Sequence, residues 1–157
     1  MAYDHTQRGR FHLLLVFLGL VLVLVGSLLP EGGAEAGETV TPWWLAGVGA
    51  LFLGISQLFA RLRVRDLGTH LGVRFGPVPW VGRRVPYEGI RGIRVGRSSL
   101  VDGWGIHWRP GRGWIWNLWG FECVELQLEA GARLRIGTDD PAGLAAFLAD
   151  RTGIPPG

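Results

Sequence analysis

Two long runs of apolar residues without a charged side chain dominate the first part of the chain. The first run extends from Phe11 to Leu29 and the second from Trp43 to Ala60. A helix needs about 20 predominantly apolar residues to cross the hydrocarbon core of a bilayer, and both runs come close to that length. The pattern therefore predicts a membrane α-hairpin, with spans at 11–29 and 43–60 joined by an extracytoplasmic loop at 30–42.

The flanks of the two runs predict the orientation of this hairpin. Arg8 and Arg10 precede the first run, arginines at 61, 63 and 65 follow the second, and the loop between them carries carboxylates but no basic residue. Because basic residues favour the cytoplasmic side, both termini are expected in the cytoplasm, with residues 1–10 as a short tail. The second span is expected to begin with Thr41 as N-cap and Pro42 at its first helical position.

An alternative for the first run is a cleavable signal peptide, because Ala34, Glu35 and Ala36 resemble a small-residue cleavage site. A two-helix anchor accounts better for the length of the run and for the second apolar run close behind it. Small residues recur at Ala46, Ala50 and Gly54, and Gly19 lies seven residues before Gly26. Such spacing favours close packing of the two helices.

From Arg61 onward the pattern changes to short alternating segments, which are typical of half-buried strands. The clearest case is a hairpin in which Val124, Leu126 and Leu128 face Ile136, Leu134 and Ala132 across a loop at 129–131. Gly131 falls where such a loop favours positive φ. The same register places Glu125 opposite Arg135 on the exposed face.

Several further alternating segments precede this hairpin, and one amphipathic helix follows it. Asp140 is expected to cap the helix, Pro141 to begin it and Gly153 to end it. We therefore expect 61–157 to be an α+β soluble domain. About seven antiparallel strands would form a bent sheet or open barrel, with the C-terminal helix covering one end.

Tryptophans mark a second hairpin within this domain. Trp104, Ile106 and Trp108 share one face of a predicted strand, and a face of its partner carries Trp114, Trp116 and Leu118. We expect these side chains to form a buried cross-strand ladder. The alternative is an exposed aromatic surface that contacts lipid headgroups or a partner protein.

Charge separates the two halves of the domain. All 16 of the Lys and Arg positions are arginine, and 61–112 contains 11 of them against three carboxylates, whereas 113–157 has a net charge of −3. Anionic lipids would attract the basic half, although its arginines are also explained as solvated strand faces. The candidate contact residues for a lipid or a partner are Arg61, Arg63, Arg65, Arg83, Arg84 and Trp80.

The sequence shows no clear catalytic motif and no metal-binding motif. His5, His12, His70 and His107 lack metal-ligand spacing, and the single cysteine, Cys123, excludes an internal disulfide and a cysteine-based zinc cluster. Asp139 and Asp140 are read as part of a helix start rather than as a catalytic pair. We therefore expect no enzyme activity, no cofactor and, without a recognised reading motif, no nucleic-acid binding.

Three segments together resemble a known family. They are Val85 to Val95, with its PYEGI sequence, Gly105 to Asn117, with aromatic residues around a Pro-Gly turn, and Arg135 to Leu144, which contains RIGTDDP. In order and spacing they are similar to small bacterial membrane proteins in which a two-helix anchor precedes a pleckstrin-homology-like (PH-like) domain. The resemblance implies a PH-like fold and membrane association, and it carries over no functional residue.

These observations lead to a functional hypothesis. The chain is expected to be a non-enzymatic, multi-pass protein of the bacterial cytoplasmic membrane, whose cytoplasmic PH-like domain binds a protein partner or helps to assemble a membrane complex. The alternative is that the basic half next to the spans binds anionic lipid headgroups directly. A third class, a small membrane enzyme, would require a polar cluster in a cleft.

Overall fold

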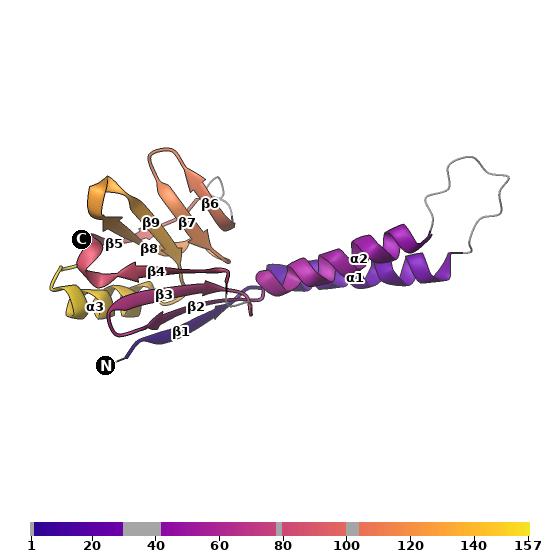
Figure 1. Cartoon of the computed structure of the whole chain (residues 1–157), viewed down its shortest axis with the longest axis horizontal. Helices are drawn as coiled ribbons and strands as arrows, with labels where there is room; N and C mark the ends of the chain where they lie inside the picture. Colours follow the sequence, from indigo (N-terminus) through magenta and orange to yellow (C-terminus); the bar gives the residue numbers. More distant parts are fainter. Residues whose placement is uncertain (1, 30–41, 78–79, 100–103) are drawn as a thin grey trace. The chain divides into compact units, whose positions relative to one another are not determined.

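The computed structural model describes residues 2–29, 42–77, 80–99 and 104–157, and these divide into two compact units (Figure 1). The helical unit comprises Arg10–Ala60. The sheet unit comprises Met1–Gly9 together with Arg61–Gly157. The sheet unit is therefore discontinuous in sequence, because the helical unit is inserted between its first few residues and the remainder.

The helical unit consists of α1 (Phe11–Leu28) and α2 (Pro42–Leu58), which pack side by side. Glycine allows the close approach: a Cβ on Gly19 would lie 2.9 Å from the carbonyl oxygen of Gly49, and a Cβ on Gly49 would lie 2.6 Å from that of Gly19. Gly19 and Gly26 are both buried, as the sequence spacing predicted.

The packing face predicted for the second helix is wrong. Ala50 and Gly54 are exposed, and a Cβ on Gly54 would meet nothing within 4 Å, whereas Gly49 and Ser56 are buried. The helix is turned so that Gly49 and Ser56, seven residues apart, lie against α1. Spacing alone could not distinguish these two small-residue faces, because both recur on one side of a helix.

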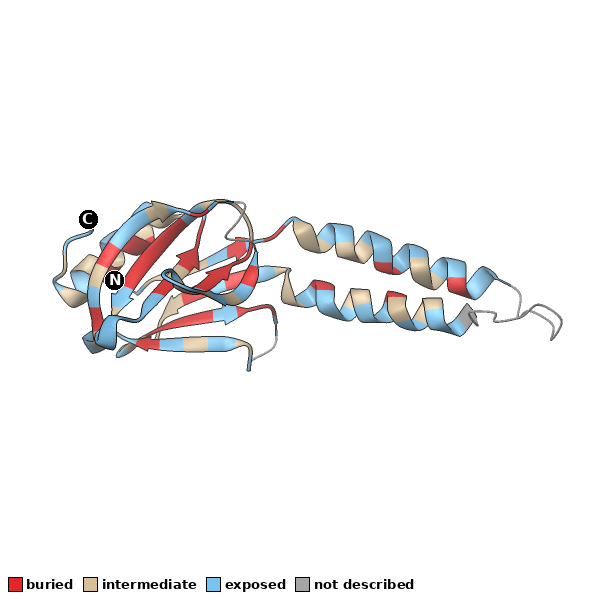
Figure 2. Cartoon of the chain, turned by 90° about the horizontal axis from the view of Figure 1, so that it is seen from above, coloured by how far each residue is buried: buried red, intermediate tan, exposed pale blue. Residues whose placement is uncertain are grey.

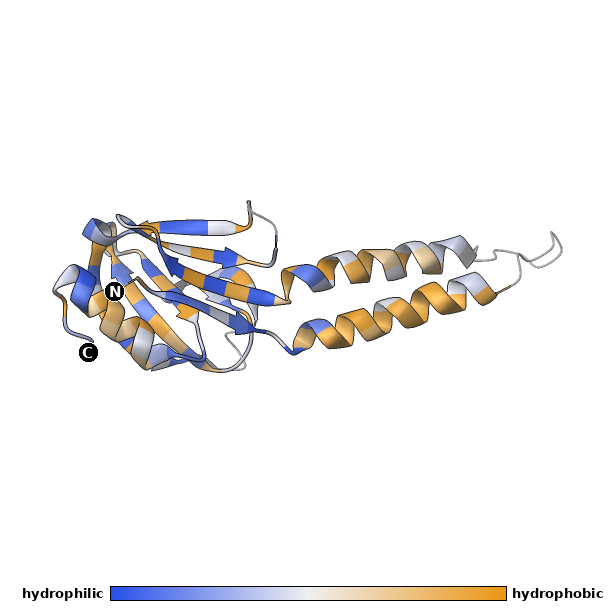
Figure 3. Cartoon of the chain, turned by 90° about the horizontal axis from the view of Figure 1, so that it is seen from below, coloured by the Kyte–Doolittle hydropathy of each residue, from blue (hydrophilic) through white to orange (hydrophobic). Residues whose placement is uncertain are grey.

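Among the described helices, only α1 is long and apolar enough to cross a membrane by length and composition. The second helix has 17 residues and ends at Leu58 rather than Ala60. In Figure 3 most of the visible face of α1 and much of that of α2 is hydrophobic. The predicted cap Thr41 and almost all of the predicted loop at 30–42 lie outside the described residues.

Sheet A is a four-stranded antiparallel meander in the order β1 (Asp4–Arg8), β2 (Arg61–Asp66), β3 (His70–Phe75) and β4 (Gly82–Pro86). Strand β1 corrects the expectation that residues 1–10 form a tail. It pairs with β2 from Asp4 opposite Arg65 to Arg8 opposite Arg61. The sequence DHTQR has no apolar alternation, so only its pairing with β2 identifies it as a strand.

Sheet B contains five strands in the order β5-β8-β9-β7-β6, namely β5 (Ile90–Arg97), β8 (Glu122–Leu128), β9 (Arg133–Gly137), β7 (Gly113–Asn117) and β6 (Gly105–Arg109). The predicted β8–β9 register is confirmed, with Leu126 opposite Leu134 and Glu125 opposite Arg135. The expectation that this charged pair lies on an exposed face is wrong, because the side chains of Glu125 and Arg135 are only 11% and 15% exposed. Gly131 adopts the expected positive φ of 74° in the short turn η3 (Glu129–Gly131).

The structure is α+β with a C-terminal helix, as expected, but its sheets differ from the predicted single antiparallel sheet. The described residues form nine strands in two sheets. Strands β7 and β9 are parallel, with Trp114 beside Leu134 and Trp116 beside Ile136. This arises because the β8–β9 hairpin places β9, rather than β8, next to β7.

The helix α3 (Pro141–Thr152) closes the core of the sheet unit. Asp140 caps it by accepting a hydrogen bond from the Gly143 N–H at 3.0 Å, and Gly153 ends it in the left-handed conformation, as predicted. It packs against β5, β8 and the short turn η1 (Tyr87–Gly89). Figure 2 shows the buried stretches along the strands of both sheets. Large fully buried side chains come from the strands (Leu62, Leu71, Ile90, Leu126, Leu134 and Ile136) and from α3 (Leu144 and Leu148).

Candidate anion-binding site

Arginines gather on the exposed face of sheet A because β2, β3 and β4 alternate between basic or glycine residues and apolar residues. The register places Arg65 beside Gly72 and Gly72 beside Arg84 in one row. In the next row Arg63 lies beside Arg74, which lies beside Gly82. Since side chains alternate along a strand, the intervening residues Leu62, Val64, Val73 and Val85 turn to the other face and are buried.

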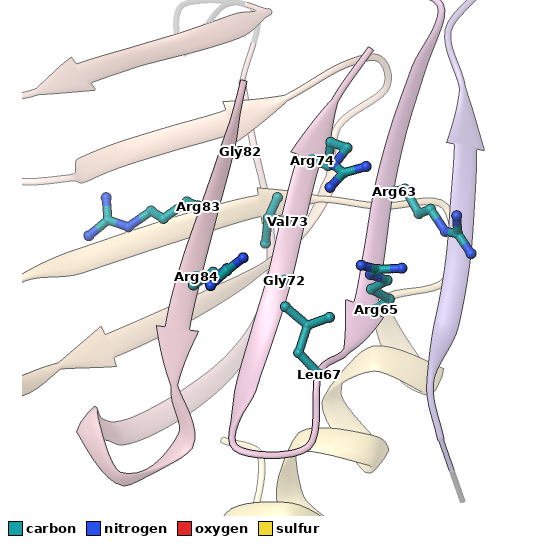
Figure 4. A pocket seen from close by; sticks show the side chains of 9 residues that line it. All are labelled: Arg63, Arg65, Leu67, Gly72, Val73, Arg74, Gly82, Arg83 and Arg84. Atoms are coloured by element: carbon teal, nitrogen blue, oxygen red, sulfur yellow. The ribbon is translucent and has the colours of Figure 1, made fainter. Parts of the chain in front are cut away.

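These rows surround a depression of about 150 Å³, which we call the arginine basin (Figure 4). Its rim carries Arg63, Arg65, Arg74 and Arg84. The side chain of Leu67 forms a wall, since a Cβ on Gly72 would lie 2.7 Å from Leu67 Cδ1. Glycine at position 72 is therefore what lets Leu67 lie between Arg65 and Arg84 in the wall of the basin.

One arginine of the rim is neutralised within the fold. Arg63 donates from Nε to Asp4 Oδ1 at 2.7 Å and from Nη2 to Asp4 Oδ2. This hydrogen-bonded pair holds the pKa of the Asp4 carboxyl below its usual range. The charge of Arg63 is thus balanced by strand β1.

The other three rim arginines have no ion-pair partner among the described residues, although the charge of Arg65 also lowers the pKa of Asp4. Arg65, Arg74 and Arg84 form no hydrogen bond or ion pair with the residues that the structure describes. Arg74 and Arg84 are exposed and Arg65 is half-buried. A planar guanidinium presents donors that match phosphate or carboxylate oxygens in pairs. The basin is therefore suited to binding an anion.

The structure brings some of the predicted contact residues together and separates others. Arg63, Arg65 and Arg84 lie on the rim as described. Arg83 also lines the basin, but in Figure 4 its side chain points away from the other rim arginines. Arg61 is opposite Arg8 at the end of β2 and does not line the basin, and neither does Trp80, which is 79% exposed.

Sequence reasoning missed Arg74. The alternation in His70–Phe75 already placed this residue on the face opposite Leu71 and Val73. What the sequence lacked was the register between β2 and β3, which sets Arg74 beside Arg63. The basin could therefore not be assembled from the pattern of single strands.

A second cluster of charged residues, around Asp66, is paired within the protein. The side chain of Asp66, only 4% exposed, accepts hydrogen bonds from the Tyr87 hydroxyl and the Gly68 N–H, each at 2.8 Å, and pairs with Arg151 of α3. Burial alone would raise the pKa of Asp66, but the bonds from Arg151, Gly68 and Tyr87 outweigh it and lower that pKa. This cluster ties sheet A to α3 and leaves no free charge for a ligand.

The remaining acidic and histidine residues form no metal site in the described part of the chain. Asp140 acts as the helix cap that the sequence predicted, and it also accepts a hydrogen bond from the Tyr3 hydroxyl at 3.3 Å. Its neighbour Asp139 lies 2.5 Å from Nε2 of His5 in strand β1. These contacts hold the N-terminal strand against the start of α3.

The predicted ladder is only partly buried, which corrects the prediction: Leu118 is buried, but of the ladder's four tryptophans only Trp116 is. The expected register is present, with Ile106 opposite Trp116 and Trp108 opposite Trp114. Trp116 is 7% exposed and contacts Phe75 edge to face, but Trp108 is 58% and Trp114 is 42% exposed. Trp108 lies on the edge strand β6 beside the turn, whereas Trp116 lies further along β7, next to Ile136.

Comparisons with protein-family models, curated proteins and solved structures find no match to this chain. The features of this chain that bear on its function are the arginine basin, the exposed tryptophans and the apolar helices. The PH-like resemblance stays a prediction.

Proposed function

We propose that this chain is a non-enzymatic membrane protein whose sheet unit binds anionic phospholipid headgroups through the arginine face of sheet A. The observation that carries the proposal is the convergence of Arg65, Arg74 and Arg84, which have no hydrogen-bond or ion-pair partner among the described residues, on one small basin. An arginine close to an anionic membrane surface contributes about 1 kcal/mol, so three give roughly a hundredfold in affinity.

The helical unit supports attachment to the membrane. Large apolar side chains are exposed on both helices, among them Phe17 and Leu28 of α1 and Trp43 and Leu51 of α2. An apolar surface of this extent on a helix pair is unfavourable in water and favourable in lipid. With 17 residues, α2 is one residue shorter than α1, the described helix that is long enough by itself, and we take α2 as a short second span within the range of about 17 to 25 residues.

The pairing of β1 with β2 supports two crossings of the membrane rather than one. The first strand precedes α1 and the second follows α2, yet they are hydrogen-bonded neighbours in sheet A. The chain must therefore leave and re-enter the same compartment, so both helices cross or neither does. Cleavage after Ala36 would also remove β1 from sheet A, which argues against a signal peptide. The arginine asymmetry favours the cytoplasm for the sheet unit.

A soluble derivative tests lipid binding. Because Arg8 and Arg61 are directly opposite, residues 10–60 can be replaced by a short glycine-serine turn, giving a turn-linked sheet unit whose folding is first verified by circular dichroism. We expect it to co-sediment with phosphatidylglycerol vesicles, less so as salt rises, and not with phosphatidylcholine vesicles. Replacing Arg65, Arg74 and Arg84 by glutamine should remove the binding.

The matched control is Arg94→Gln, which removes an exposed arginine of β5 that lies in sheet B. It should reduce vesicle binding far less than a single replacement in the basin. Equal binding to neutral and anionic vesicles would refute the lipid proposal.

The exposed aromatic face of the β6–β7 hairpin favours a second candidate function, which is docking of a protein partner. Trp108 and Trp114 form an exposed cross-strand pair, and exposed tryptophans are enriched at the centres of protein interfaces. A crosslinker placed at position 108 of the full chain in native membranes tests this function. A discrete adduct that disappears in a Trp114→Ala variant would support it, and crosslinks to lipid alone would contradict it.

A further inference from the structure

The arginine basin has the dimensions of a site for one phosphate group. Its volume is about 150 Å³, and an engineered protein cavity of about that volume holds benzene, a molecule of six heavy atoms. A phosphate group has fewer heavy atoms than benzene, so it fits with room for a bridging water. The missing side chain of Gly72 leaves room for Leu67, whose Cδ1 would lie 2.7 Å from a Cβ on Gly72, so Leu67 forms the apolar wall of the basin between Arg65 and Arg84.

The number of free arginines indicates which kind of phosphate fits. A phosphomonoester carries a charge of about −1.5 to −2 at pH 7 and three strong acceptor oxygens. A phosphodiester has only two unesterified oxygens and a single negative charge. Three unpaired guanidiniums therefore match a phosphomonoester, in which each terminal oxygen can accept from a different arginine.

The pair between Asp4 and Arg63 sets the limit of the site. Since both carboxylate oxygens of Asp4 are engaged by Arg63, neither of these groups needs an external partner. The arginines that remain available to a ligand in the basin are thus Arg65, Arg74 and Arg84, since Arg83 also lines the basin but points away from them. Attraction of an anion by net positive charge alone would not depend on which arginines line the basin.

We infer that the arginine basin is a phosphomonoester site, in which Arg65, Arg74 and Arg84 hold the terminal phosphate oxygens beside the wall formed by Leu67. This inference builds on the proposed function, because it specifies the headgroup: a lipid with a terminal phosphate, such as phosphatidic acid, binds better than a phosphodiester lipid of the same membrane. A soluble phosphomonoester presents the same group and is the other source of the ligand.

The first experiment titrates inorganic phosphate into the full chain in neutral detergent and follows the Nε–H signals of arginine side chains by NMR. The signals of Arg65, Arg74 and Arg84 should shift along one common saturation curve, while that of Arg94 stays constant. Dimethyl phosphate, a diester probe, should bind at least about tenfold more weakly, because it loses one charged hydrogen bond.

Variants separate a shaped site from general attraction. Gly72→Ala keeps the net charge but places a Cβ against Leu67, so it should abolish phosphate saturation. Arg84→Lys keeps the charge and loses the paired donors, so we expect affinity to fall by about tenfold. Arg94→Gln removes one charge elsewhere and should leave affinity unchanged. The arginine variants keep the test informative even if Gly72→Ala fails to fold.

The second experiment identifies the source of the phosphate. The full chain is purified in neutral detergent with equal amounts of phosphatidic acid and phosphatidylglycerol, and bound lipid is counted by native mass spectrometry. Retention of phosphatidic acid that inorganic phosphate displaces indicates a lipid headgroup. Saturation by inorganic phosphate without such retention indicates a soluble ligand. Both results support the phosphomonoester site.

Two results would overturn the inference, and neither is the same as failure of the proposed function. One is the absence of any saturable shift with inorganic phosphate. The other is an equal loss of affinity in Arg84→Gln, Arg74→Gln and Arg94→Gln, which would indicate net charge alone. Salt-sensitive binding to phosphatidylglycerol vesicles could persist in either case. Conversely, phosphate binding without any vesicle binding would retain the site and refute the lipid function.

Discussion

Replacing Trp116 by alanine and, separately, Trp108 by alanine should have very different effects on the stability of the sheet unit. The two residues have the same chemistry and lie in adjacent strands of one hairpin. Their environments differ, because Trp116 is 7% exposed and packs against Phe75 whereas Trp108 is 58% exposed. The pair therefore tests burial with the residue type held constant.

The magnitude follows from burial. Removing a buried tryptophan side chain typically costs about 3 to 5 kcal/mol, from lost burial and the cavity that remains. For Trp108 the loss is limited to an exposed cross-strand contact with Trp114, which contributes about 0.2 to 1 kcal/mol. A domain of about a hundred residues loses about 4 to 8 °C in melting temperature per kcal/mol, so Trp116→Ala should lower it by more than about 12 °C.

Thermal unfolding of the turn-linked sheet unit, followed by circular dichroism, measures both variants against the parent. Trp116→Ala should melt far below the parent or fail to fold, and Trp108→Ala should melt within about 8 °C of it. Similar melting temperatures for the two variants would refute the assignment of Trp116 to the core and of Trp108 to the surface.

Four further predictions concern the first strand, a buried carboxylate, the helix pair and the topology. Deleting residues 2–8 of the turn-linked unit removes the Tyr3–Phe147 stack and the hydrogen bond from Gln7 to the Trp119 carbonyl. The loss of about 2 kcal/mol should lower the melting temperature by at least about 8 °C. An unchanged melting temperature would show that β1 is dispensable. The lowered pKa of folded Asp66 means that its ionised form stabilises the fold above the unfolded value of about 3.9, and that this stability is lost as pH falls through the folded pKa. Asp66→Asn should therefore be destabilising in urea at pH 7, with a difference from the parent that shrinks below about pH 4, and a pH-independent difference would contradict the assignment. Gly19→Leu should separate α1 from α2 in detergent, as read by an engineered inter-helix crosslink, whereas Gly54→Leu, in open space, should not; equal crosslinking would refute the packing. Reporter fusions should place Gly157 in the cytoplasm and Glu35 outside, and an external C-terminus would overturn the orientation.

The sequence by itself determined the features that depend on neighbours along the chain. Helix α3 could be delimited because Asp140, Pro141 and Gly153 act through local backbone geometry. The register of the β8–β9 hairpin could be predicted because a short loop fixes which residues face each other, as Leu126 and Leu134 do. The apolar run of α1 was evident for the same reason, since its length and composition are local properties.

Tertiary structure alone decided the features that depend on residues distant in sequence. Strand β1 forms because Arg61–Asp66 is brought beside it after an insertion of two helices, a pairing that its own polar sequence does not signal. Whether a tryptophan is buried depends on which residues from other strands pack against its ring. Trp116 packs against Phe75 of sheet A and is buried, whereas Trp108 stays exposed. The arginine basin required the register of three strands, because only side-by-side pairing could set Arg74 and Arg84 around Gly72.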